Sequence, residues 1–191
     1  MRRRFAKRIY TARPFFYDMA FLMARLPRAI VAIRNPDITR AFIEKIMMVI
    51  TAVNGCVYCE WFHARQASSC GMTAREISNL FNLQFHAEAT DFELPALLYA
   101  QHYAETDRHP DAEMTHNLDA FYGAPTANTI RLFIRMIYFG NLVGNTWDAV
   151  LHRLRGRPAA GSSLTFEAVF TLLVGWAMVP VMLLMWFDRR H

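Results

Sequence analysis

Two thiols, an imidazole and a carboxylate lie at short, fixed spacings in the first third of the chain. Two residues separate Cys56 from Cys59, and three more separate Cys59 from His63. Eleven residues separate Glu44 from the first cysteine. Residues three and four apart share one face of a helix, so the two thiols and the imidazole would form one stripe. Thiols placed in this way lie within disulfide reach, and the pattern indicates thiol redox chemistry.

The expected surroundings of the cysteine pair favour a reactive thiolate. Cys56 follows Asn54-Gly55 and would lie in the first turn of a helix, where unpaired backbone N–H groups stabilise an anion. His63 can accept a thiol proton or stabilise the thiolate as an imidazolium. Glu44, delivered by the preceding helix, can orient that imidazole and hold its proton.

These residues resemble the pattern of the alkylhydroperoxidase D family, within the carboxymuconolactone decarboxylase-like superfamily. The family pattern is Glu, eleven residues, Cys-x-x-Cys, three residues and His, and here it is Glu44, Cys56-Val57-Tyr58-Cys59 and His63. Asn54-Gly55 before the pair is similar too, and a looser likeness extends over residues 38–154. The resemblance implies an all-helical fold, homo-oligomers and thiol-dependent reduction of a hydroperoxide substrate.

The resemblance also implies a role for each residue. Cys59 would attack the peroxide, and Cys56 would resolve the sulfenic acid to a disulfide and exchange with a dithiol or disulfide reductant protein. Glu44 and His63 would form the proton relay. The chemistry agrees, because a sulfenic acid must be trapped by a second thiol before it is over-oxidised. We expect no cofactor beyond the redox-active cysteine pair and no bound metal, and the pair argues against a decarboxylase.

The elements that would position these residues are all predicted to be helices. Residues 38–53 repeat apolar side chains at helical spacing, and a second helix over 56–70 would end at Gly71. Packed antiparallel, these two helices would bring residue 44 alongside residues 59–63. Thr73 and Glu76 form a capping-box pattern before a helix over 74–81. Further helices are predicted over 96–105, 112–121 and 126–154.

The N-terminal segment, residues 1–36, is strongly basic, with nine Arg and Lys and a single acid, Asp18. Residues 15–33 predict one or two short helices with a break at Pro27. Positive charge mixed with aromatic residues suits the surface of a membrane of anionic lipid. A solvated tail and an organelle transit peptide are the alternatives. No nucleic-acid-binding module accompanies the charge, so we expect no nucleic acid partner.

The C-terminal segment is apolar. Residues 155–163 have the composition of a linker, and residues 168–187 contain no charged side chain. About 20 such residues cross a bilayer, which predicts a transmembrane helix. Arg153, Arg155 and Arg157 before it outnumber the basic residues after it, which predicts a redox domain on the cytoplasmic side. A buried oligomerisation helix is the alternative, which Glu167 and Pro180 favour.

The composition fits one core of moderate size, with 191 residues, 54% of them hydrophobic and 19% charged. Three cysteines do not make a secreted disulfide framework. We expect a basic amphipathic segment (1–36), a redox domain (37–154), a linker (155–163) and an apolar helix (164–191). Cys70 is expected to be a small buried side chain, and Gly140 and Gly144 to permit close helix packing.

The function predicted from these features is reduction of hydroperoxides by a thiol peroxidase at a membrane surface. Three alternatives use the same residues. The pair could exchange disulfides with a protein partner and never need peroxide. Glu44, His63 and both cysteines could ligate zinc. The chain could also be a non-catalytic accessory subunit of a membrane protein complex.

Overall fold

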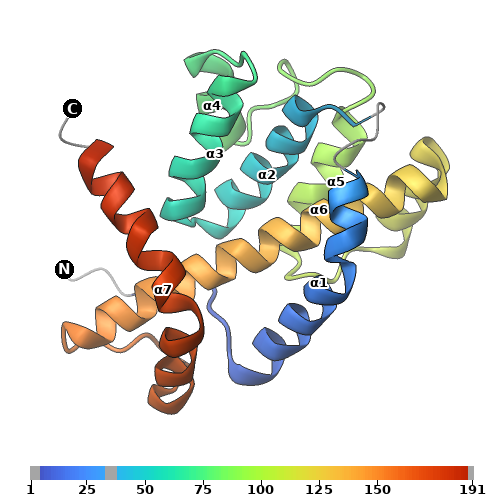
Figure 1. Cartoon of the computed structure of the whole chain (residues 1–191). Helices are drawn as coiled ribbons and strands as arrows, with labels where there is room; N and C mark the ends of the chain where they lie inside the picture. The colour runs from blue at the N-terminus through green and yellow to red at the C-terminus, as the bar shows by residue number, and fades with distance from the viewer. Residues whose placement is uncertain (1–4, 33–37, 189–191) are drawn as a thin grey trace.

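The computed structural model describes residues 5–32 and 38–188, and these residues form seven helices without a strand (Figure 1). The all-α prediction is confirmed. The helices are α1 (Ala12–Ala32), α2 (Arg40–Asn54), α3 (Val57–Ser69), α4 (Ala74–Phe81), α5 (Leu94–Glu105), α6 (Ala112–Leu154) and α7 (Leu164–Asp188). The expected turn at residues 35–37 and the basic residues Arg2, Arg3, Arg4, Arg34, Arg189 and Arg190 lie outside the described residues.

Local signals in the sequence set most of the helix ends. The Thr39 side chain caps α2 by accepting the N–H of Phe42, and the same helix ends at Gly55, whose backbone is left-handed with φ 67°. Gly71 (φ 89°) closes α3, as predicted. Thr73 and Glu76 form the predicted capping box before α4, in which each side chain accepts from the other's backbone N–H.

Two predicted helix breaks have different outcomes. The break at Pro27 is wrong, because α1 continues through this residue. Pro27 has no N–H to donate to the carbonyl of Met23, four residues earlier. Both residues are exposed, so water can bond to that carbonyl instead. The break between 121 and 126 is confirmed as a kink, since Gly123 has the non-helical angles φ 72° and ψ 154° within the long run of α6.

Helices α2 and α6 form the centre of the packing. Helix α2 contacts α3, α4, α5 and α6, while α6 also contacts α1 and α7. Figure 1 shows α6 crossing the whole molecule, with α7 crossing it toward one end. Helix α7 packs against α3 as well, so the C-terminal helix closes over the part of the molecule that carries the cysteine pair.

Phe15 joins α1 to both α6 and α7. Its side chain is completely buried, and its ring lies 5.9 Å from that of Phe139, 5.7 Å from Phe166 and 5.4 Å from Phe170. Helix α1 therefore shares one aromatic cluster with α6 and α7, which lie far from it in the sequence. The nearby Asp18 adds a buried polar tie, because it accepts hydrogen bonds from Tyr10 and from Arg108.

Helix α7 is the one helix among the described residues that is long and apolar enough to cross a membrane. One face of it packs on the protein through Phe166, Phe170 and Met178, and the opposite face exposes Leu172 (82%) and Trp176 (76%). Both ends of α7 are tied to other helices. Arg153 pairs with Glu167 near its start, and Arg65 and Trp61 bind Asp188 at its end.

Replacing Phe15 with Ala should lower the free energy of unfolding by about 3–5 kcal/mol, because the cavity would open where α1, α6 and α7 meet. Phe16→Ala is the matched control, since this neighbouring ring is 42% exposed. Its cost should stay below about 1 kcal/mol. Urea unfolding of the purified proteins measures both values, and equal losses would show that the aromatic cluster does not hold the three helices together.

Candidate active site

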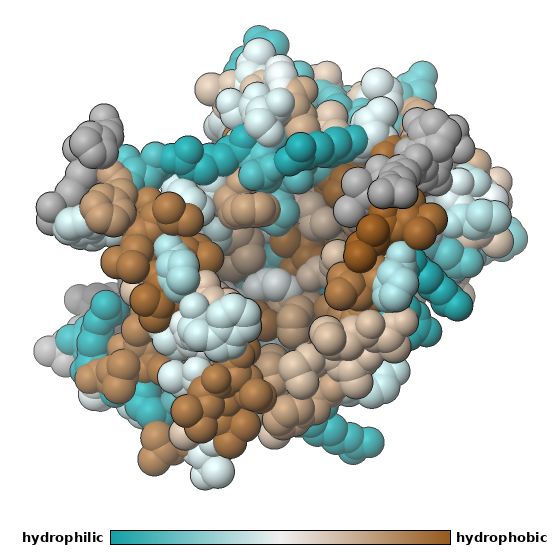
Figure 2. Space-filling model, in the orientation of Figure 1, coloured by the Kyte–Doolittle hydropathy of each residue, from teal (hydrophilic) through white to brown (hydrophobic). Residues whose placement is uncertain are grey.

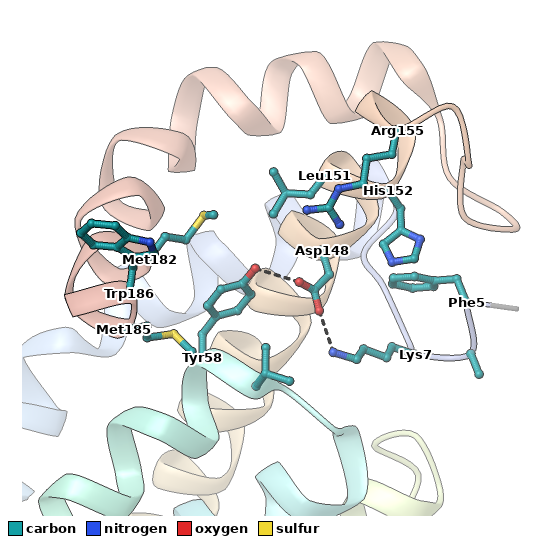
Figure 3. A pocket seen from close by; sticks show the side chains of 12 residues that line it. Phe5, Lys7, Tyr58, Asp148, Leu151, His152, Arg155, Met182, Met185 and Trp186 are labelled. Atoms are coloured by element: carbon teal, nitrogen blue, oxygen red, sulfur yellow. Dashed lines mark hydrogen bonds and ion pairs between the residues drawn. The ribbon is translucent and has the colours of Figure 1, made fainter. Parts of the chain in front are cut away.

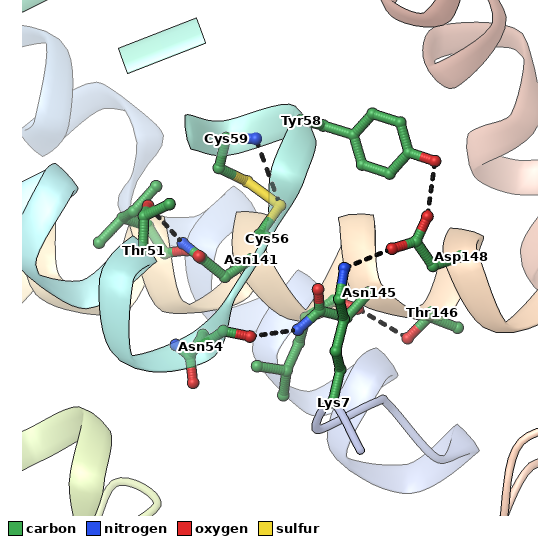
Figure 4. The surroundings of a disulfide bond; sticks show 12 residues. Lys7, Thr51, Asn54, Cys56, Tyr58, Cys59, Asn141, Asn145, Thr146 and Asp148 are labelled. Carbon is green, nitrogen blue, oxygen red and sulfur yellow. Dashed lines mark hydrogen bonds and ion pairs between the residues drawn. A yellow bond between two sulfur atoms is a disulfide. The ribbon is translucent and has the colours of Figure 1, made fainter. Parts of the chain in front are cut away.

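A tight turn between α2 and α3 places the cysteine pair. The left-handed Gly55 donates its N–H to the carbonyl of Thr51 at 2.8 Å, which ends α2 and reverses the chain. Cys56 then becomes the N-cap of α3, with its sulfur accepting the N–H of Cys59 at 3.3 Å. The two sulfurs form a disulfide across a Cα–Cα distance of 5.4 Å (Figure 4). The predicted disulfide reach is confirmed.

The two cysteines differ in exposure. The Cys56 side chain is completely buried, whereas that of Cys59 is partly exposed. Cys59 is therefore the more accessible cysteine of the pair.

Glu44 and His63 meet across the α2–α3 interface. Glu44 Oε2 lies 2.7 Å from His63 Nδ1, and the two side chains are only 10% and 12% exposed. Arg40 bonds to Gln66 one turn further along the same interface, as antiparallel packing requires. With Nδ1 held by the carboxylate, Nε2 is the ring nitrogen left for proton transfer. The structure thus brings together all four residues singled out in the sequence, and their chemical roles stay predictions.

Gly144 of α6 lies directly under the disulfide. A Cβ added at this glycine would stand 2.6 Å from Cys56 Sγ and 3.2 Å from the Tyr58 ring. A Cβ at Gly140, one turn earlier, would meet nothing within 4 Å. The close packing predicted for these glycines is therefore confirmed at Gly144, where α6 closely approaches Cys56 Sγ.

Two buried asparagines of α6 donate hydrogen bonds to the end of α2, next to the turn. Asn145 donates to the backbone carbonyl of Asn54 at 2.9 Å, and Asn141 donates to the Thr51 hydroxyl at 3.2 Å (Figure 4). Both asparagine side chains are completely buried. Sequence reasoning missed them, although two amides four residues apart in an apolar helix are a signal that a buried polar contact exists.

Tyr58, inside the Cys-x-x-Cys, connects the pair to a polar chain that sequence reasoning also missed. Its hydroxyl donates to Asp148 at 2.8 Å, and Asp148 also binds Lys7 at 2.6 Å (Figure 3). Burial, followed by the hydrogen bond to Asp148, raises the pKa of Tyr58 above its ordinary value. The hydroxyl therefore stays protonated and fixes the ring beside the disulfide. These residues line a cavity of about 570 Å³ below α7.

A second cavity, of about 320 Å³, opens on the reactive side of the pair. Cys59 and His63 both line it, so the more exposed cysteine and the histidine border one space. The remaining lining is almost entirely apolar: Met47, Tyr58, Phe62, Met136, Ile137, Gly140, Gly144, Met178 and Val181.

Other candidate groups do not add to this site. Cys70 is a free thiol and is partly exposed, so the expectation of a buried side chain is wrong, because the residue lies at the C-terminal cap of α3 rather than inside the core. Within residues 5–32 and 38–188, no group of three or more His, Cys, Asp or Glu side chains could hold a metal ion.

Residues 18–102 match the model of the carboxymuconolactone decarboxylase family. The match begins within α1 and ends within α5, and it includes the turn, the cysteine pair, Glu44 and His63. No curated protein and no solved structure matches the chain.

Gly144→Ala should lower the free energy of unfolding of the oxidised protein by about 1–3 kcal/mol, because its new methyl group overlaps Cys56 Sγ and forces α3 away from α6. Gly140→Ala is the matched control and should not destabilise, since its methyl group enters open space. Urea unfolding under non-reducing conditions compares the two variants. Equal stabilities would mean that the approach of α6 to the disulfide is not a constraint.

Proposed function

We propose that the protein is a thiol peroxidase that reduces hydroperoxides, because residues 18–102 match the model of the carboxymuconolactone decarboxylase family, which includes alkylhydroperoxidase D. One observation carries the proposal. The partly exposed Cys59 can form a disulfide with a buried Cys56, and it shares its cavity with an imidazole held by a buried carboxylate.

The first step oxidises Cys59. Its thiolate attacks the terminal oxygen of the hydroperoxide, a sulfur–oxygen bond forms, and the oxygen–oxygen bond breaks. The alkoxide that leaves takes a proton from the His63 imidazolium and departs as an alcohol. Glu44 accepts the Nδ1 hydrogen bond at 2.7 Å and so stabilises the charged imidazole before the proton is transferred.

The second step protects the oxidised sulfur. Cys56 attacks the Cys59 sulfenic acid, and hydroxide leaves with the thiol proton as water. The disulfide in the structure is the product of this step. The 5.4 Å Cα–Cα distance lies within the range of ordinary disulfides, so the step needs no large movement of the backbone.

A reductant dithiol protein must then supply two electrons and two protons. The family resemblance assigns the exchange to Cys56. The complete burial of Cys56 and the partial exposure of Cys59 favour attack on Cys59 instead, which would release Cys56 as a thiolate at the N-cap of α3. The same accessibility supports the second candidate function, thiol–disulfide exchange with a protein partner and no peroxide.

We place this chemistry at a membrane. Helix α7 exposes one apolar face, and α1 exposes Met23 (66%), Ile30 (54%) and Val31 (69%). Figure 2 shows both as brown areas on the same side of the molecule. Arg25 and Arg28 on α1 would meet anionic headgroups. Because α7 is docked along the protein at both ends, its exposed face is the part that would contact lipid.

Three further predictions complete the proposal. They are a redox domain on the cytoplasmic side of the membrane, homo-oligomers, and association with membrane lipid or a membrane protein complex. The accessory-subunit alternative would require the protein to be inert, although all four reactive residues are in place.

Peroxide oxidation of the reduced protein tests the proposal. Mass spectrometry after acid quenching should show a Cys56–Cys59 disulfide within one equivalent of hydroperoxide. His63→Ala should slow its formation by about 100-fold or more, because general acid–base catalysis is lost. Glu44→Gln should slow it by a smaller factor.

His116→Ala is the matched control for these variants, since His116 is exposed on α6 and far from the pair in sequence. It should react at the wild-type rate. A protein that forms no disulfide with peroxide, yet exchanges with a dithiol protein, would replace the peroxidase by the thiol–disulfide oxidoreductase.

Membrane binding is tested by flotation of the full-length protein with vesicles of phosphatidylcholine and anionic phosphatidylglycerol. The double variant Leu172→Ser, Trp176→Ser removes the two most exposed side chains of α7 and should weaken partitioning about 100-fold, from a loss of roughly 3 kcal/mol of transfer free energy. Leu154→Ser is the control, since Leu154 is 78% exposed but lies on α6. Wild-type protein that remains at the bottom of the gradient would contradict membrane binding.

A further inference from the structure

A cavity of about 470 Å³ lies between α1 and residues 128–135 of α6. It shares no lining residue with the cavity of Cys59, so it is separate from the reactive site. None of the described residues that line it is acidic. Its wall includes four arginines, two from each helix: Arg25, Arg28, Arg131 and Arg135. Like charges around one cavity repel one another, so the arrangement favours an anion between them.

Two carboxylates among the described residues contact these arginines, and both are already engaged. Asp119 binds Arg131 at 2.8 Å. Asp18 lies 3.7 Å from Arg135, but it holds Arg108 more closely, at 2.7 Å. The positive charge of Arg135 is therefore only partly balanced.

The two arginines of α1 have no carboxylate partner. In the described part of the chain, neither Arg25 nor Arg28 forms an ion pair. The guanidinium carbon of Arg25 instead lies 3.7 Å from the centroid of the Phe21 ring, and that of Arg135 lies 3.3 Å from the same centroid. One aromatic ring thus holds a cation from each helix beside the cavity, which orients both guanidinium groups before a ligand arrives.

A phosphate is the anion that this wall fits best. Guanidinium groups bind phosphate oxygens through paired N–H donors. Asn128 adds a neutral donor, because its side-chain oxygen accepts from Arg131 and its NH₂ group is left to donate. A phosphate monoester carries roughly −1.5 to −2 charges at pH 7, against the single charge of a carboxylate. The volume of the cavity is in the range for small organic ligands, so it also has room for the group that the phosphate esterifies.

We infer that this cavity binds a phosphate monoester. Arg25, Arg28 and Arg135 hold the phosphate, and Arg131 adds to the positive field. Binding ties α1 to α6 and needs neither a peroxide nor a reduced cysteine, so the inference is independent of the proposed peroxidase. Two sources carry the same group: a soluble organic phosphate, and the headgroup of a lipid such as phosphatidic acid.

The soluble source is tested by isothermal titration calorimetry of the full-length, detergent-purified protein with glycerol 3-phosphate. The wild-type protein should bind this probe saturably. The double variant Arg25→Gln, Arg28→Gln should raise the Kd about tenfold or more, because charge-assisted hydrogen bonds to the phosphate are lost. Arg75→Gln removes the same kind of charge from an exposed position of α4 outside the cavity. This control should leave the Kd within about twofold, since a distant surface charge is screened.

The lipid source is tested by flotation with two kinds of vesicle of equal surface potential. One contains phosphatidic acid, a phosphate monoester, and the other contains phosphatidylglycerol, a phosphate diester. A lipid headgroup in the cavity should make the wild-type protein bind the phosphatidic acid vesicles about tenfold more tightly, because the monoester offers more charge to the guanidinium groups. The double variant should lose this preference, and Arg75→Gln should keep it.

The outcomes decide both the site and its source. Saturable binding of glycerol 3-phosphate, or a preference for phosphatidic acid, supports the inference when the double variant loses it and the Arg75→Gln control does not. Absence of both, or an equal loss in the control, would overturn the inference and leave the arginines as solvated surface charges. If the double variant unfolds, Arg28→Gln replaces it, since Arg28 is exposed, and unchanged binding in that variant would equally overturn the site.

Discussion

The left-handed backbone at Gly55 controls where every reactive group lies. Only Gly55 and Cys56 lie between the end of α2 and the start of α3, so the two helices pack side by side and Glu44 reaches His63. The same turn makes Cys56 the N-cap of α3, where its sulfur is buried, and places Cys59 one turn further along the helix. Glycine adopts such a conformation at little cost, whereas other residues are strained there.

Helix α6 holds this turn from the opposite side. Asn145 binds the carbonyl of Asn54, and the missing side chain of Gly144 leaves room for the disulfide. The turn is therefore fixed both by its own hydrogen bond and by a distant helix. A site fixed in this way holds the exposed thiol, the imidazole and the carboxylate in one arrangement while the two sulfurs change their bonding.

The sequence allowed the local part of this architecture to be predicted and left the distant part open. Helix ends at Gly55, Gly71 and Thr73 follow from capping chemistry, and the meeting of Glu44 with His63 follows from helical spacing across a short turn. Gly144 under the disulfide could not be placed, because nothing in its neighbourhood reports on a residue 88 positions earlier in the chain. The same holds for Lys7 and Asp148, which are 141 residues apart.

The C-terminal helix shows why composition alone does not decide the position of a helix. Its length and apolarity are typical of a membrane span. Its buried Glu167, in contrast, is typical of a helix that packs within a protein. The structure combines the two properties, since one face is buried against α3 and α6 and the other is exposed. Only the three-dimensional packing shows that Met178 and Val181 belong to the reactive cavity.

The most direct test of the account is the identity of the first oxidised sulfur. Reduced Cys56→Ser protein is mixed with one equivalent of hydroperoxide in the presence of dimedone, and the labelled residue is located by peptide mass spectrometry. The account predicts one dimedone adduct, on Cys59, and none in the matched Cys59→Ser protein. Labelling of Cys56 in the Cys59→Ser protein at the same rate, or no labelling of Cys59, would contradict it.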